Sequence, residues 1–180
     1  MRPSSEAVCS TNHTRSLERP ADSSDSERGQ EKPTGQEQQR LTIVIFRGDP
    51  IDAPQYRHTA LLIEHLNQEG VRTDYRTLEV IGSAGIFERE ENATCDPGKS
   101  ATFVGSVAVA TIPVTGSSSS RLRDVIWSTP INNSENSWNC QNWVGDALNL
   151  CIGDKLILSE ESDRAIDGMV DYILQARDVA

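Results

Sequence analysis

Short apolar runs bounded by turn residues predict β-strands in the first two thirds of the chain. Residues Leu41–Phe46 form a run rich in β-branched side chains, which is typical of a strand. Two further strands, His58–Glu64 and about Asp74–Ile81, flank the turn residues Asn67–Gly70 and predict a β-hairpin. Another strand is predicted at Ser106–Val114. The Ala-Leu-Leu-Ile-Glu segment of the hairpin is also compatible with a helix.

Helical periodicity replaces this pattern in the last third of the chain. Leu122, Val125 and Ile126 have the spacing of one helix face. Ser120 precedes them as an N-cap residue, and Pro130 ends the segment.

Two longer helices are predicted to follow. One begins near Ser137–Asn139 and ends at Gly153, and the other runs from about Ser159 to Arg177. Each has apolar residues that recur about once per helical turn and so form one face. These residues are Trp143, Val144, Ala147, Leu148 and Cys151 in the first helix, and Ile166, Met169, Val170, Ile173 and Leu174 in the second.

Strands precede helices along the chain, and Gly85–Gly105 between two of the strands is predicted to be mostly loop. This order favours an α+β fold in which an antiparallel sheet packs on helices. A hairpin centred between Gln68 and Glu69 places His58 opposite Glu79, on the same face of the sheet. A shift of one residue would separate the two side chains.

The chain divides by composition into a polar segment and a domain. Residues 1–40 contain few apolar side chains and no aromatic one, so burial cannot offset the entropy lost on ordering them. We predict a disordered tail over residues 1–40 and a single α+β domain over residues 41–180.

The net charge of -10 at pH 7 argues against nucleic acid or an anionic membrane as a partner, since both require basic patches. No window approaches the roughly 18 apolar residues of a membrane helix, and the N-terminus lacks an apolar signal segment. We therefore expect a cytoplasmic protein with free thiols. Three histidines without a Cys-x-x-Cys motif argue against zinc, and we expect no metal and no other cofactor. Nothing in the sequence indicates an oligomeric state.

Cys140 lies where the first of the two long helices is predicted to begin. The unpaired N–H groups and the dipole of a helix N-terminus favour a thiolate, which is the nucleophilic form of cysteine. A thiolate requires a base. His13 falls in the predicted tail and His65 near a turn, which leaves His58 as the candidate. Glu79 is the candidate for the group that orients the imidazole.

Other interpretations of these residues remain open. Tyr75 or Thr77 could orient the imidazole in place of Glu79. A free cysteine on an amphipathic helix is also typical of core packing, as are tryptophans beside it. If the thiol is catalytic, we expect Gln141, Asn139 and Trp138, which flank it, to contact the substrate.

The segment "WNCQNWVGDAL" resembles the cysteine motif of circularly permuted papain-like proteins. That motif reads Asn-Cys-Glu-His-Phe in the lecithin retinol acyltransferase group, and Asn-Cys-Asn followed by an aromatic residue in the PPPDE isopeptidases. Here Asn139, Cys140, Gln141 and Trp143 match it. The segment "YRHTALLIE" resembles the acyltransferase strand His-Trp-Ala-Ile-Tyr-Val and places His58 at the catalytic histidine.

The resemblance covers roughly residues 41–155, and the chain is also similar to uncharacterised fungal proteins with a comparable strand and helix. The acyltransferase group has a second histidine where this chain has Gly70, so Glu79 would take its place. The absence of an apolar tail anchor argues against a lipid substrate.

The resemblance implies a papain-like fold in which the histidine strand precedes the cysteine helix. It also implies a thiol-dependent hydrolase or acyl/peptidyl transferase that acts on the carbonyl of an amide, isopeptide or ester in a small molecule or peptide. Two other functions stay open: a catalytically inactive binding module with this fold, and an accessory protein of a biosynthetic pathway.

Overall fold

The computed structural model describes residues 35–114 and 119–177. Within these ranges a five-stranded antiparallel sheet packs against three α-helices, which confirms the predicted α+β class. The strands are ordered β4-β3-β2-β1-β5 across the sheet. Their bounds are β1 Gln38–Phe46, β2 His58–Leu66, β3 Arg72–Ile81, β4 Glu88–Asn92 and β5 Phe103–Pro113.

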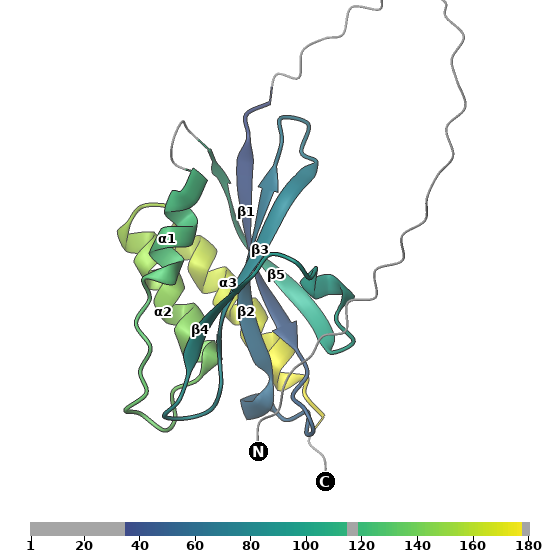
Figure 1. Ribbon diagram of the computed structural model, residues 1–180, viewed down its shortest axis with the longest axis vertical. Coiled ribbons are helices and arrows are strands. Elements are labelled where there is room, and N and C mark those ends of the chain that lie inside the picture. The colour runs from purple at the N-terminus through teal and green to yellow at the C-terminus, as the bar shows by residue number, and fades with distance from the viewer. Residues whose placement is uncertain (1–34, 115–118, 178–180) are drawn as a thin grey trace, which may run out of the picture.

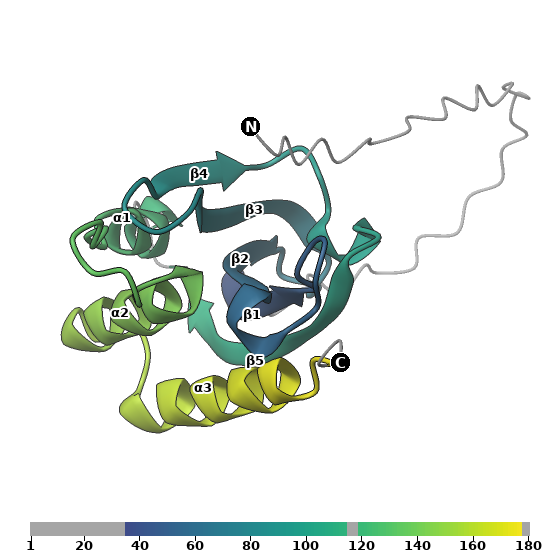
Figure 2. The same ribbon diagram turned by 90° about the horizontal axis from the view of Figure 1, so that it is seen from below.

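The helices cover one face of the twisted sheet (Figures 1 and 2). α1 (Arg121–Trp127) and α2 (Cys140–Gly153) pack together, and α2 lies against β2. α3 (Ser159–Leu174) packs on β5 and β1. Two short 3-10 segments, η1 (Pro54–Tyr56) and η2 (Pro97–Lys99), lie in the connections. None of the helices in the described ranges has the length and apolar content needed to cross a bilayer.

The predicted elements are confirmed, with some shifted bounds. The Ala-Leu-Leu-Ile-Glu segment is part of β2 and not a helix, because its residues pair with both β1 and β3. α3 ends at Leu174, before the predicted Arg177. β1 begins at Gln38, inside the predicted tail of residues 1–40, because residues 38–40 pair with both neighbouring strands. Residues 1–34 of that predicted tail lie outside the described residues.

β4 corrects the prediction that Gly85–Gly105 is mostly loop. Its sequence, Glu-Arg-Glu-Glu-Asn, has no apolar alternation, but it pairs with β3 along one edge of the sheet. Arg89 donates to the backbone carbonyl of Thr129, and Glu91 accepts from Arg76 and Arg123. These polar contacts hold β4 in place of apolar packing. The sequence of β4 therefore lacks the alternating apolar residues by which a strand is usually recognised.

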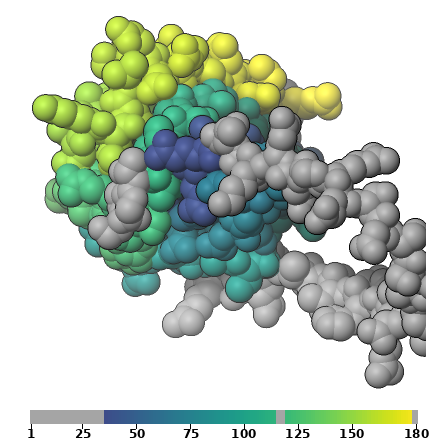
Figure 3. Space-filling model, turned by 90° about the horizontal axis from the view of Figure 1, so that it is seen from above, coloured from purple at the N-terminus to yellow at the C-terminus, as the bar shows by residue number. Residues whose placement is uncertain are grey.

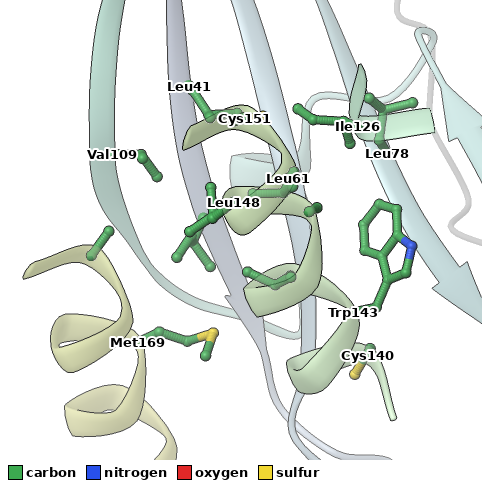
Figure 4. Packing of buried hydrophobic residues seen from close by; sticks show 14 of the residues in the cluster. Leu41, Leu61, Leu78, Val109, Ile126, Cys140, Trp143, Leu148, Cys151 and Met169 are labelled. Atoms are coloured by element: carbon green, nitrogen blue, oxygen red, sulfur yellow. The ribbon is translucent and has the colours of Figure 1, made fainter. Parts of the chain in front are cut away.

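The core lies between the sheet and the helices. Alternate residues of β1, β2 and β3 face the helices, and the buried face of α2 packs on them (Figure 4). Trp143 has no solvent exposure and is the largest fully buried side chain. From the upper end of the sheet, Figure 3 shows the first residues of β1 at the centre, with α2 and α3 along one side. α2 is thus fixed over the sheet along its length, and its N-terminal end lies toward the lower end of the sheet in Figure 1.

Gly105 on β5 allows α3 to approach the sheet. A Cβ at this position would lie 2.4 Å from Cε1 of Tyr172, closer than any unstrained contact. Gly145, in the interior of α2, differs because a Cβ there would meet nothing within 4 Å.

We expect Gly105→Ala to lower the free energy of unfolding by about 1–3 kcal/mol, since the added methyl group displaces the Tyr172 ring. Gly145→Ala is the control and is expected to raise it by about 0.5–1 kcal/mol through the better helix propensity of alanine. Urea unfolding of both variants measures the effects. Equal midpoints for Gly105→Ala and the wild type would contradict this packing.

Candidate functional site

Three chain segments meet at the lower end of the sheet in Figure 1: the start of β2, the end of β3 and the start of α2. They carry His58, Glu79 and Cys140, respectively. The sequence predicts these residues as nucleophile, base and orienting group, in the order Cys140, His58 and Glu79. The structure brings all three together.

Cys140 is the first residue of α2, where the sequence predicts it. Asn139 is the N-cap residue, and its side-chain oxygen accepts from the Gln141 backbone N–H at 2.8 Å. The Asn142 side chain accepts in turn from the Asn139 backbone N–H, which completes a capping box. The Cys140 backbone N–H lies at the first helical position, where no intrahelical acceptor exists.

His58 and Glu79 are joined directly, but not by the predicted pairing. Leu61 lies opposite Leu78, a register two residues away from the predicted one. A shift of two residues keeps both side chains on the same face, so His58 reaches Glu79 diagonally. The distance from His58 Nε2 to Glu79 Oε2 is 2.5 Å. Phe46 stacks on the imidazole with a centroid separation of 5.9 Å.

The thiol of Cys140 interacts with the imidazole of His58, and the charges of the two groups depend on each other. Burial favours a neutral imidazole, but hydrogen bonds to Cys140 and Glu79 outweigh it and raise the pKa of His58 to about 10. Burial likewise opposes ionisation of the thiol, but the hydrogen bond and charge of His58 lower the pKa of Cys140. The arrangement therefore favours a thiolate–imidazolium pair.

The two groups differ in their exposure. Cys140 is 9% exposed and belongs to the apolar cluster, whereas 30% of the His58 side chain is exposed. Sγ of Cys140 lies 3.9 Å from the carbonyl oxygen of Arg57. The thiol thus lies at the edge of the core, with the imidazole as its more solvent-exposed neighbour.

Thr59 and Arg57 also belong to the site, and neither is among the residues predicted from the sequence. The backbone and side chain of Thr59 add to the effect of His58 in lowering the pKa of the thiol. The alternation of β2 could have indicated Thr59, because it shares a face with Leu61 and Ile63. Arg57 is 5% exposed and binds Asp52 through two nitrogens, at 2.9 and 2.8 Å.

Arg57 also links the site to α3. Its third guanidinium nitrogen, Nη1, donates to the backbone carbonyl of Tyr172 near the end of that helix. The hydrogen bond from Arg57 lowers the pKa of Asp52, so the carboxylate stays charged beside the buried guanidinium. This cluster fixes the segment that leads into β2.

The chain matches a family of unknown function, DUF6540, over residues 45–157. This match covers more than half of the 180-residue chain. The chain belongs to the DUF6540 family. No similar protein was found among curated proteins or among solved structures. The DUF6540 segment contains His58, Glu79 and Cys140, and its description assigns them no activity.

Within the DUF6540 segment, Gln141 has a structural role, and its contact with a substrate stays a prediction. Its amide nitrogen donates to the backbone carbonyls of Pro54 and Arg57, at 3.0 and 3.1 Å. These bonds attach the first turn of α2 to η1 and to the residue before His58. The amide nitrogen of Gln141 therefore already donates to two backbone carbonyls within the protein.

Asn139 and Trp138 also have partners within the protein. Asn139 caps α2, as described above. Trp138 is 6% exposed, and its ring packs edge-on against that of Phe87 with a centroid separation of 5.5 Å. Its Nε1 donates to Oδ2 of Asp146 at 3.2 Å. Both residues shape the surroundings of the thiol, and their contact with a substrate stays a prediction.

The other described cysteines have different environments. Cys95 and Cys151 are free thiols, as is Cys140. Burial raises the pKa of Cys151 to about 12, so this thiol is neutral at physiological pH and is a packing residue. Within the described ranges, no group of three or more His, Cys, Asp or Glu side chains is arranged to hold a metal ion.

A hollow of about 510 Å³ lies between α2 and α3, and Gln141 and Asn142 of the first turn of α2 line part of it. Its lining includes the carboxylates of Asp146, Asp163 and Asp167. Neither Cys140 nor His58 lines it, so we assign it no part in the chemistry of the thiol.

The structural role of Gln141 can be measured. We expect Gln141→Ala to lower the free energy of unfolding by about 1–2 kcal/mol, because two partly buried carbonyls lose the hydrogen bond from its amide. Gln141→Glu is expected to cost more, since it places a carboxylate against those carbonyls. Urea unfolding provides the comparison, with Asn149→Ala on the exposed face of α2 as the control. If all three variants had the stability of the wild type, Gln141 would not attach α2 to η1.

Proposed function

We propose that the protein is a thiol-dependent hydrolase or acyl/peptidyl transferase with a papain-like fold in circularly permuted order. The observation that carries this proposal is the meeting of Cys140, His58 and Glu79 at the start of a helix, with the pKa of the thiol lowered and that of the imidazole raised. Perturbed titratable groups that activate one another are typical of catalytic sites.

The order of the elements agrees with the permuted arrangement. The strand that begins with His58 precedes the helix that begins with Cys140, and the strand carrying Glu79 is paired with the first. Glu79 binds Nε2 of the imidazole, which leaves Nδ1 as the ring nitrogen for the thiol.

In the proposed reaction, the thiolate of Cys140 attacks the carbonyl carbon of an ester, amide or isopeptide, and a C–S bond forms. The Cys140 backbone N–H stabilises the oxyanion of the tetrahedral intermediate. The intermediate collapses as the C–O or C–N bond breaks, and His58 transfers its proton to the leaving group. The product of this half-reaction is a thioester on Cys140.

The second half-reaction restores the free enzyme. Neutral His58 removes a proton from water or from an acceptor amine, which attacks the thioester carbon. The C–S bond breaks, and the sulfur leaves as the thiolate beside the imidazolium. Glu79 keeps the ring oriented through both steps by accepting from Nε2. The proposed reaction requires no cofactor.

A catalytically inactive binding module is the second candidate, and the low exposure of the Cys140 thiol favours it. Burial, together with the charge of Asp154, raises the pKa of the Cys151 thiol. The lowered pKa of Cys140 therefore distinguishes it from a packing cysteine and supports the catalytic proposal.

The alkylation of Cys140 by iodoacetamide across pH tests the pair. The thiolate reacts, so a lowered pKa predicts that Cys140 reacts at lower pH than the cysteine of an unstructured peptide, which has a pKa of about 8.5. We expect His58→Ala to reduce the rate at pH 6.5 by about tenfold or more, since one pKa unit changes the thiolate fraction tenfold.

Peptide mass spectrometry resolves each cysteine separately in this experiment, and Cys151 is the internal control because it should remain unmodified in the folded protein. A wild-type rate at Cys140 that equals that of the unstructured peptide, or that does not depend on His58, would leave the binding module as the better proposal.

Catalysis itself is tested with activated acyl esters and with isopeptide-linked peptides. We expect a mass increase equal to the acyl group on Cys140, and a fall in turnover of about a thousandfold or more in Cys140→Ala. Cys95→Ala, which removes a partly exposed free thiol elsewhere, is expected to retain full activity. Turnover that persists in Cys140→Ala would exclude this cysteine as the nucleophile.

A further inference from the structure

The hydroxyl of Thr59 is buried without a hydrogen-bond partner in the described part of the protein. Thr59 has no solvent exposure, and its Oγ1 finds neither a carbonyl nor a carboxylate. Burying a hydroxyl in this way is unfavourable, and such groups are uncommon in folded proteins. A specific acceptor that becomes available in one state of the protein would account for it.

The position of the Cys140 sulfur makes it the candidate acceptor for the Thr59 hydroxyl. Thr59 lies on the face of β2 that also carries Leu61 and Ile63, toward the helices. The first turn of α2 reaches this face, where Sγ of Cys140 lies 3.9 Å from the carbonyl oxygen of Arg57, two residues before Thr59. Thr59 also adds to the lowering of the pKa of the thiol. A neutral thiol is a weak acceptor, whereas a thiolate accepts strongly.

The charged groups around the sulfur come from three segments. His58 on β2 faces it directly, and Glu79 on β3 lies behind the imidazole. Arg57 precedes β2, but its guanidinium is directed to Asp52 and to the carbonyl of Tyr172. From α2 itself, the neighbouring Gln141 is neutral and bound to backbone carbonyls. Among these groups, Thr59 supplies a buried neutral donor that no other acceptor engages.

We propose that Thr59 is a positioning residue whose hydroxyl donates a hydrogen bond to the sulfur of Cys140 and holds it as a thiolate between β2 and the imidazole. This inference rests on the proposed function. The bond is strongest when the sulfur is charged and weakens when the sulfur becomes a thioester. It therefore also favours departure of the thiolate when the acyl group is released.

The test compares the pH profile of Cys140 alkylation in Thr59→Val, Thr59→Ser and the wild type. Valine has nearly the shape of threonine but no hydroxyl, and serine retains the hydroxyl. We expect the midpoint of the profile to rise by about one pH unit or more in Thr59→Val, the size of a hydrogen bond to a charged group. Thr59→Ser is expected to return the midpoint to within a few tenths of a unit of the wild type.

Thr129→Val is the matched control, because Thr129 Oγ1 is also buried without a partner but belongs to the segment after α1. Its midpoint is expected to equal that of the wild type. Urea unfolding shows whether each variant is folded. Thr59→Ala also lacks the hydroxyl and gives the same comparison if the valine variant does not fold.

The outcomes separate this inference from the proposed function. A low wild-type midpoint that rises in Thr59→Val and returns in Thr59→Ser supports both. A low midpoint that Thr59→Val leaves unchanged, or that Thr129→Val raises equally, overturns the role of Thr59 and leaves the cysteine–histidine chemistry intact. A wild-type midpoint equal to that of an unstructured thiol overturns both.

Discussion

The attachment of the first turn of α2 to the start of β2 is the constraint on which the rest of the site depends. Gln141 fixes the two segments to each other through the carbonyls of Pro54 and Arg57, and Trp143 anchors the same turn in the core. Asn139 caps the helix, so that it begins at Cys140. The sulfur, the imidazole and the Thr59 hydroxyl are neighbours because this attachment holds the first turn of α2 against the start of β2.

Two opposing effects act on the thiol. Removal from water favours the neutral form of any cysteine, and Cys151 shows that effect on the same helix. At Cys140 the neighbouring imidazole and the donors of Thr59 reverse it. The reversal requires contacts at hydrogen-bonding distance, so it depends on the positions of side chains and not on the helix N-terminus alone.

The α+β class, the hairpin and the bounds of α2 could be predicted because local patterns encode them. The face shared by His58 and Glu79 also follows from alternation and survives the shift of two residues in register. β4 could not be predicted, since charged contacts with distant residues hold it. The hydrogen bonds of Gln141 could not be predicted, because its polarity in a helix turn says nothing of its partners, which are the carbonyls of a segment far away in the sequence. Thr59 could be found only once the position of the sulfur was known.

The hydrogen bond from Arg57 to the end of α3 extends the folding unit beyond the family segment. The DUF6540 match ends at residue 157, before α3 begins at Ser159. Yet Tyr172 accepts from the buried guanidinium that orders the approach to His58, and Ala165, Met169 and Ile173 complete the core. A fragment limited to the family segment would retain every candidate catalytic side chain but lose part of the scaffold that holds them. The segment of sequence similarity is therefore shorter than the part of the chain that folds together.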